Sequence, residues 1–185
     1  MQGSQKGCGT PGAAWYLSAA LRLPVFATMT AREIDVILAG DPIEAIEAAK
    51  RLISADAIDA SALTAVAVNK KNKTAARVAA IYALSFSDGD AIAAPALADL
   101  VADRNDDEEC RAHAAEALAH LSEPRAVPLM GQILARDDSA RVKRWCIYAL
   151  GEIGGAKARK ILKQFEKTSP TGELSDELRS ALSRG

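Results

Sequence analysis

The chain has 185 residues, enough for one domain with its own core, and its 49% hydrophobic and 25% charged residues are ordinary for a soluble globular protein. Aromatic residues make up only 4%, which favours closely packed helices over a β-sandwich. The net charge of −1 excludes a global field that would draw the protein to nucleic acid, and no apolar run reaches the roughly 18 residues that span a bilayer.

The N-terminal segment differs from the rest of the chain, because residues 1–32 carry three basic side chains and no acidic one. Residues 1–12 are rich in glycine and polar side chains, which predicts disorder, and residues 13–23 predict a short apolar helix. We interpret residues 1–29 as a flexible arm. Four hypotheses remain open for it: an organelle-targeting peptide, a secretory signal, an extension upstream of a true start at Met29, and a structured arm.

Strong helical signals begin at residue 30. Thr30 and Glu33 have the spacing of a capping box, which predicts a helix that starts there and ends at Gly40. Asp41, followed by a proline, predicts the start of the next helix. Alanines and a leucine at helical spacing follow, so we interpret residues 42–70 as a degenerate first repeat.

The remainder of the chain repeats a helical hairpin. Leu84, Leu118 and Leu150 are equivalent positions, 34 and 32 residues apart. The sequence predicts first helices near 74–86, 107–121 and 139–152, second helices near 91–103, 124–136 and 156–167, and a terminal helix over 173–183. Because one hairpin cannot bury its apolar stripe alone, this period predicts a solenoid in which each hairpin packs on the next.

The repeated positions also carry a resemblance to a known family. The pattern is an acidic residue, a valine-basic pair and a leucine-glycine pair, and it is complete in the last repeat as Asp138, Val142, Lys143, Leu150 and Gly151; the two earlier repeats follow it in part. With this pattern, residues 42–167 resemble HEAT repeats, in the short bacterial form grouped with the phycobilisome-lyase type. The resemblance implies an all-α, right-handed superhelical solenoid of about four HEAT-like hairpins over residues 30–185, with capping helices at both ends.

The resemblance also implies a class of function. HEAT-like proteins are mostly interaction scaffolds, so we expect a non-catalytic protein-interaction module or accessory subunit, cytoplasmic and without a cofactor. Its protein partner is not identified by the sequence. The alternatives are an enzyme-associated role related to the bilin lyases and, less favoured, nucleic-acid binding. We expect no membrane association, and self-association through the solenoid ends if they are left uncovered.

Two surfaces are predicted to bind the partner. Tyr82 and Tyr148 occupy the same slot of two repeats, and Trp145 lies beside Arg144. Exposed Tyr, Trp and Arg are typical interface anchors, although such rings also fill grooves between helices. The second surface is a basic edge on one helix, formed by Lys157, Lys160 and Lys163 with Arg159 and Lys167. Such an edge suits an acidic partner or phosphates.

One constellation has the side chains of a metal site. His113, Glu116 and His120 share one face of a helix, and imidazole and carboxylate are ligands of zinc or iron. That face lies opposite the apolar stripe and is predicted to be solvated, so no metal site is expected. Cys110 and Cys146 are interpreted as small buried hydrophobic residues.

Two further sets recur from repeat to repeat and are predicted to be structural. The short acceptors are expected to cap helices and the basic side chains to bridge to the next unit. The acceptors are Asn72, Asp106 and Asp138, and the basic residues are Arg77, Arg111 and Lys143. We predict that Arg111→Ala lowers the melting temperature without a specific effect on binding, which a thermal melt and a binding assay would test.

Overall fold

The computed structural model describes residues 28–87, 92–136 and 139–184, and the regular structure in these ranges is helical. A first helix covers residues 28–39. The elements that follow are α2 (Pro42–Ser54), α3 (Ala60–Val68), α4 (Thr74–Leu84), α5 (Ala93–Ala102), α6 (Glu108–His120), the 3-10 turn η1 (Pro124–Ala126), α7 (Val127–Arg136), α8 (Ala140–Ile153), α9 (Gly155–Glu166) and α10 (Glu173–Arg184).

The helices predicted after residue 70 are confirmed, with ends within two residues of the expected ones except at the start of α7, where the 3-10 turn η1 occupies the first three predicted positions. The predictions for residues 1–27, including the apolar helix over 13–23, lie outside the described residues. The predicted turn at Gly154 is confirmed: its φ of +67° ends α8, and α9 begins at the next residue. A residue with a side chain would be strained in this left-handed conformation.

The prediction of a capping box at Thr30 is wrong, because residues 28 and 29 are already helical. The Thr30 hydroxyl instead donates to the carbonyl oxygen of Ala57 over 3.2 Å. Glu33 accepts hydrogen bonds from Nε and Nη2 of Arg51 at 2.9 and 2.7 Å. Both side chains therefore tie the first helix to α2 and the α2–α3 connection, since tertiary partners replace the local ones that the spacing suggested.

The end of the first helix and the start of α2 follow the prediction. Gly40 has a φ of +68°, and the Asp41 side chain accepts hydrogen bonds from two amides in the first turn of α2. The side chain of Lys73 lies against this turn, and its Nζ donates to the carbonyl oxygen of Ala39 at 2.8 Å. A Cβ at position 40 would lie 2.6 Å from Cδ of Lys73, so glycine is required on both counts.

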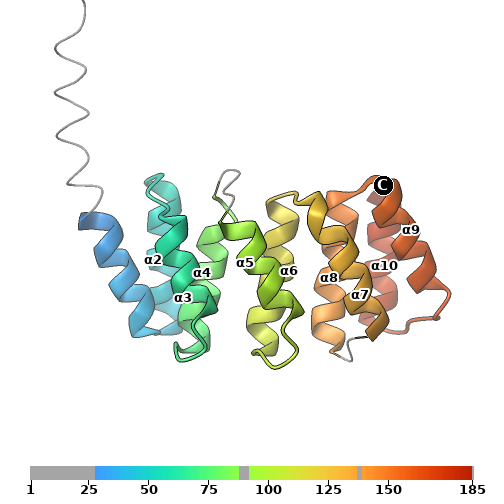
Figure 1. Ribbon diagram of the computed structural model, residues 1–185, viewed down its shortest axis with the longest axis horizontal. Helices are drawn as coiled ribbons and strands as arrows, with labels where there is room; N and C mark the ends of the chain where they lie inside the picture. Colours follow the sequence, from blue (N-terminus) through green and yellow to red (C-terminus); the bar gives the residue numbers. More distant parts are fainter. Residues whose placement is uncertain (1–27, 88–91, 137–138, 185) are drawn as a thin grey trace, which may run out of the picture.

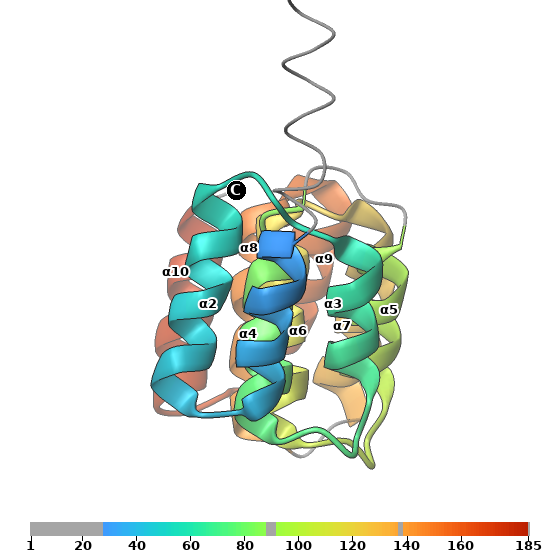
Figure 2. The same ribbon diagram turned by 90° about the vertical axis from the view of Figure 1, so that its left-hand side faces the viewer.

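The helices form two layers in an elongated stack (Figure 1). One layer contains α2, α4, α6, α8 and α10, and the other contains α3, α5, α7 and α9. In the end-on view the chain rises through the first layer, descends through the second and moves away from the viewer in a clockwise sense (Figure 2). The stack is therefore a right-handed solenoid, and the predicted fold class is confirmed.

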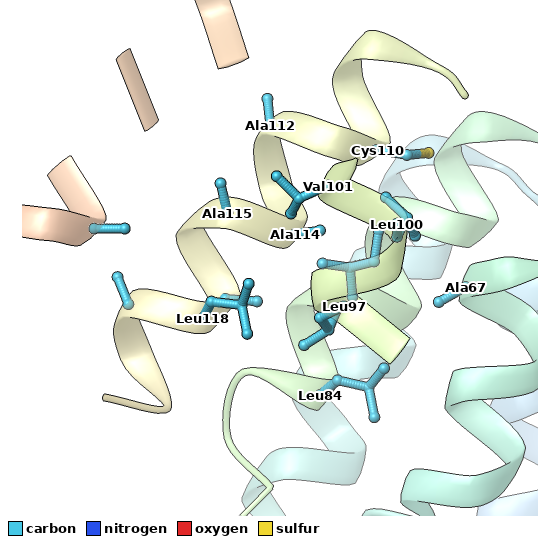
Figure 3. Close-up of a cluster of buried hydrophobic side chains, with 14 of the residues drawn as sticks. Ala67, Leu84, Leu97, Leu100, Val101, Cys110, Ala112, Ala114, Ala115 and Leu118 are labelled. Atoms are coloured by element: carbon cyan, nitrogen blue, oxygen red, sulfur yellow. The ribbon is translucent and has the colours of Figure 1, made fainter. Parts of the chain in front are cut away.

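The core lies between the layers. Leu97, Leu100 and Val101 of α5 pack against α6, where Ala114 and Leu118 are also buried (Figure 3). Each such leucine contributes on the order of 2 kcal/mol through burial. Helices α3, α5 and α7 pack more closely on the first-layer helix that follows them than on the one before. The hairpins predicted from the sequence pair each first-layer helix with the helix that follows it, whereas the closest packing is with the helix that precedes it. Small alanine side chains on α4 and α6 allow this close approach.

Helix α10 lies across α8 at the C-terminal end of the stack. A Cβ on Gly151 of α8 would lie 2.8 Å from Cβ and 2.9 Å from Cα of Ala181, so only glycine permits this approach. Ion pairs at the rim join Arg184 to Glu152 and Arg144 to Glu173. The leucine-glycine pair that resembles the family pattern thus has a local role in seating α10.

Candidate functional site

Aromatic and cationic side chains gather on the face of α4, α6 and α8 that points away from the second layer. We call this the aromatic surface, made up of Tyr82, Phe86, His113, His120, Arg144, Trp145 and Tyr148. Sequence analysis named Tyr82, Arg144, Trp145 and Tyr148 as partner-binding residues. The structure does not bring all four together. Tyr82 lies in one group with Phe86 and His120, whereas Arg144, Trp145 and Tyr148 lie in a second group with His113, seven residues before His120 on α6.

The α4 side of the aromatic surface contains a residue that the sequence analysis missed. The ring of Tyr82 meets Phe86 edge to face with 5.4 Å between centroids, and Phe86 stacks on His120 at 6.2 Å. Phe86 is 45% exposed, which is unusual for so large an apolar side chain. Its position four residues after Tyr82 is the spacing that places two side chains on one helical face, and that spacing was the available signal.

The α8 side combines two rings with two guanidinium groups. Trp145 and Tyr148 meet edge to face at 5.4 Å, and Arg144 lies over the Trp145 ring at the same distance. Arg184 of α10 lies over Tyr148 at 5.3 Å, and burial raises the pKa of this tyrosine. Each ring is half-buried, so it both packs on a neighbouring helix and presents an edge to solvent.

The three candidate metal ligands do not converge. His113 Nδ1 lies 3.1 Å from a carboxylate oxygen of Glu116, whereas the ring of His120 stacks on Phe86. Among the residues that the structure describes, no group of three His, Cys, Asp or Glu side chains is placed to hold a metal ion. The face was predicted to be solvated, but His113 and Glu116 are half-buried because α8 packs beside α6.

The predicted basic edge lies on α9 and the residue that follows it. Its members are Lys157, Arg159, Lys160, Lys163 and Lys167, and all five are exposed. Within the described ranges no carboxylate lies within 4 Å of any of them. Several of these residues line one shallow depression along the helix. The edge is therefore a concentrated positive surface whose cations form no ion pair with the side chains that the structure describes.

We call the repeated basic residues Arg77, Arg111 and Lys143, with the groups that they bind, the basic ladder, and each of these positions is one rung. Its first rung, at Arg77, is a buried ion pair. Nη1 and Nη2 of Arg77 donate to the two carboxylate oxygens of Asp106 at 2.7 and 2.9 Å, and Nε donates to the carbonyl oxygen of Ala67 at 2.8 Å. Both side chains are 4% exposed. Burial opposes both charges, but their mutual hydrogen bonds outweigh it, raising the pKa of Arg77 and lowering that of Asp106. The predicted bridge to the next unit is confirmed at this rung.

The predicted caps, in contrast, are displaced by one residue. Asp107 caps α6 by accepting from the amides of Glu109 and Cys110, which leaves Asp106 free to hold Arg77. Ser139 caps α8, and Asp138 lies outside the described residues. The prediction that Asp106 is a cap is therefore wrong. Two adjacent short acceptors compete for the cap, and only one of them also reaches the neighbouring arginine.

Asn72, the third predicted cap, has a different role. Its side-chain amide donates to the carbonyl oxygen of Val66 at 3.0 Å, and the N-cap of α4 is Lys73, which makes no side-chain capping bond. The asparagine thereby closes the C-terminal end of α3, because its amide is a donor and the last carbonyls of a helix need one. The prediction of a cap at Asn72 is wrong for that reason.

The ladder changes along the stack. Arg111 is buried and its Nε donates to the carbonyl oxygen of Val101 at 3.1 Å, as Arg77 does one repeat earlier. At the third position stands Lys143, which is half-buried. In the described part of the chain its ammonium group makes neither a hydrogen bond nor an ion pair. It lines a groove between α7 and α9 with a volume of about 570 Å³.

Cys110 and Cys146 are fully buried, as predicted. Burial raises the pKa of the Cys110 thiol to about 12, so the reactive thiolate is suppressed at neutral pH. Both side chains act as small hydrophobic residues between the layers.

The two-layered stack of antiparallel helices defines the chain as an α-helical repeat protein. Residues 102–183 match the family of HEAT repeats, a segment that runs from the end of α5 into α10. The match and the fold together support a HEAT-like repeat protein, as the sequence pattern predicted. No curated protein matches the chain significantly. None of the described helices has the length and apolarity needed to cross a membrane.

Proposed function

We propose that this protein is a non-catalytic protein-interaction module and that its aromatic surface binds the partner. The fold supports a scaffold role, because a two-layered solenoid offers long helical faces with little movement of the backbone. HEAT repeats commonly mediate protein interactions, and the match to that family supports the same class of function.

The observation that carries the proposal is that half-exposed rings gather in two groups, one where α4 and α6 end and one, with arginine, between α6 and α8. Phe86 is 45% exposed, and Arg144 lies 5.4 Å from the centre of the Trp145 ring. Aromatic and arginine side chains on a rigid face lose little conformational entropy on binding and supply most of the energy at typical interfaces. An apolar patch of this kind in a protein with only 4% aromatic residues favours a binding surface over a solvated face.

Nucleic-acid binding is the second candidate, because α9 and the residue after it carry five exposed cations that pair with no carboxylate in the described ranges. The net charge of −1 weakens it, since binding to phosphates depends on a strong positive field. A bilin-lyase-related role remains a proposal that rests only on the resemblance. Retention on single-stranded DNA that falls steeply with salt, or colour on co-expression with a bilin, would favour one or the other.

The experiment is an affinity capture from lysate of the source cells with three forms of the full chain. They are the wild type, a Tyr82/Trp145/Tyr148 triple alanine variant, and a control in which the exposed apolar residues Leu38, Ile43 and Val68 become alanine. We expect one specific protein on the wild type and the control but not on the triple variant, with circular dichroism showing that all three are folded. Equal capture by all three forms would contradict a role for the aromatic surface.

A further inference from the structure

The cation of the last ladder rung lacks the carboxylate that the first rung has. Arg77 is bound by both oxygens of Asp106, which lies 29 residues further along the chain. The corresponding region after Lys143 is the connection between α9 and α10, and residues 167–172 contain no acidic side chain. Within the described residues, the chain therefore supplies a half-buried ammonium group at this position without a counter-ion.

The groove beside Lys143 has the shape and chemistry of a peptide site. Its walls are apolar, with Pro128 and Leu134 from α7 and Ile161 and Phe165 from α9. Amide and hydroxyl groups of Gln132, Gln164 and Thr168 stand among them. A volume of about 570 Å³ accommodates a few side chains, and mostly apolar walls with a few polar groups are typical of ligand pockets.

The basic side chains in and beside the groove favour an acidic ligand. Arg136 and Lys143 line the groove itself, and Gln164 is shared with the depression that Arg159, Lys160, Lys163 and Lys167 line. An ammonium group in a partly apolar site is stabilised most by a carboxylate that reaches it directly. A peptide that carries Asp or Glu beside an aliphatic residue satisfies both the cation and the walls.

We propose that the groove between α7 and α9 binds an acidic segment of a partner protein, whose carboxylate pairs with Lys143 as Asp106 pairs with Arg77. This inference rests on the proposed function, because it assumes a protein partner, but it uses a face in the second layer that is separate from the aromatic surface. The peptide's aliphatic side chain packs between Ile161 and Leu134, and the α9 cations attract flanking acidic residues.

The test is selection of a random peptide library displayed on phage against the full chain, with counter-selection against Lys143→Met. Selected peptides are synthesised with a fluorescent label and their affinity is measured by anisotropy. We expect enrichment of Asp or Glu next to aliphatic residues. Affinity falls at least about tenfold in Lys143→Met, because a charge-assisted hydrogen bond is lost, and is largely restored in Lys143→Arg.

Two further variants act as controls. Lys71→Met removes an exposed lysine far along the chain from the groove and leaves the affinity unchanged. Thr168→Asp places a carboxylate in the groove wall, where it competes for Lys143, and it also weakens the peptide at least about tenfold. Circular dichroism and the melting temperature verify that each variant is folded.

Several outcomes overturn the inference. They are selection of no peptide, selection of peptides without acidic enrichment, and equal affinity for the wild type and Lys143→Met. If the affinity of the selected peptides depends on Trp145 rather than on Lys143, the groove is not the binding site, and the result supports the proposed function at the aromatic surface. Sedimentation velocity that shows self-association lost in Lys143→Met assigns the groove to a second copy, and that result also overturns the inference.

Discussion

The middle and the C-terminal end of the stack use the same repeated position in opposite ways. At Arg77 the cation is buried, held by two carboxylate oxygens and a carbonyl, and it joins α4 to the segment before α6. At Lys143 the cation is half-buried, has no partner in the described part of the chain, and faces a groove. The comparison shows that a position with a structural role within a stack becomes available for binding where the next repeat lacks the acid.

The C-terminal end is held by different means. Helix α10 is seated by the close approach of Gly151 to Ala181 and by exposed ion pairs such as Arg144 with Glu173. Exposed ion pairs contribute little to stability, so packing carries most of this junction. The two regions should therefore respond differently to the loss of a charge and to the gain of a methyl group.

The largest effect is expected for Arg77→Met. The substitution leaves Asp106 buried without a counter-ion, which lowers the free energy of unfolding by about 3–5 kcal/mol. Urea denaturation monitored by circular dichroism measures it, with Lys71→Met as the matched control on an exposed lysine. A loss of less than about 1 kcal/mol would mean that the buried pair is not the main link between these repeats.

Acid should weaken the same rung. Because Asp106 has a lowered pKa in the folded protein, its contribution is present above the ordinary aspartate pKa of about 4 and is lost as pH falls through the folded value. The wild type is expected to exceed Asp106→Asn by about 1.5–3 kcal/mol in free energy of unfolding at neutral pH. Urea titrations at falling pH should show this difference shrinking below about pH 4, and a constant difference would refute the assignment.

Adding a methyl group at Gly151 should destabilise the packing of α10 on α8. Gly151→Ala places Cβ 2.9 Å from the backbone Cα of Ala181, and we expect a loss of about 1–3 kcal/mol despite the better helix propensity of alanine. Gly131→Ala is the control, since the nearest atoms to its Cβ are side-chain atoms of Ile161 at 3.0 to 3.4 Å and not backbone. Thermal melts of the two variants compare them, and equal melting temperatures would show that α10 is not held by close packing.

The smallest effect is expected for Lys143→Met. Among the described residues the cation has no partner to lose, so the free energy of unfolding should change by no more than about 0.5 kcal/mol. The same denaturation assay applies, beside Arg77→Met. A loss comparable to that of Arg77→Met would show that Lys143 is structural and would end the comparison between the two rungs.

Much of the fold could be predicted from the sequence, because helical period, turn residues and a repeat of 32 to 34 positions are local patterns. The role of Glu33 in the first helix could not be predicted. Its side chain can either cap the helix or bind a distant residue, and the outcome depends on Arg51, 18 residues away. The predicted caps of α6 and α8 were wrong for a similar reason. Two short acceptors stand next to each other before each helix, and the local sequence does not tell which of them caps it.

The candidate site was only partly accessible to sequence reasoning. Tyr82 and Tyr148 are predicted because they share a slot of the repeat, and Trp145 because it is a large ring beside Arg144, whereas Phe86 follows the last repeated leucine and has no repeated equivalent. The bridging histidines of α6 were considered only as metal ligands. His120 contacts Phe86 and His113 contacts Trp145; these contacts depend on which helices lie side by side, and periodicity does not specify that.

By itself, the sequence determined that this protein is a stack of helical hairpins, where most helices begin and end, and which residues form the core. Those features depend on interactions within a few turns of helix, and alanine and leucine at helical spacing encode them. Only the tertiary structure decided which cation is paired, which ring is exposed and where a groove opens. Burial and ion pairing depend on the distance between side chains about 30 residues apart, and that distance is set by how the layers pack.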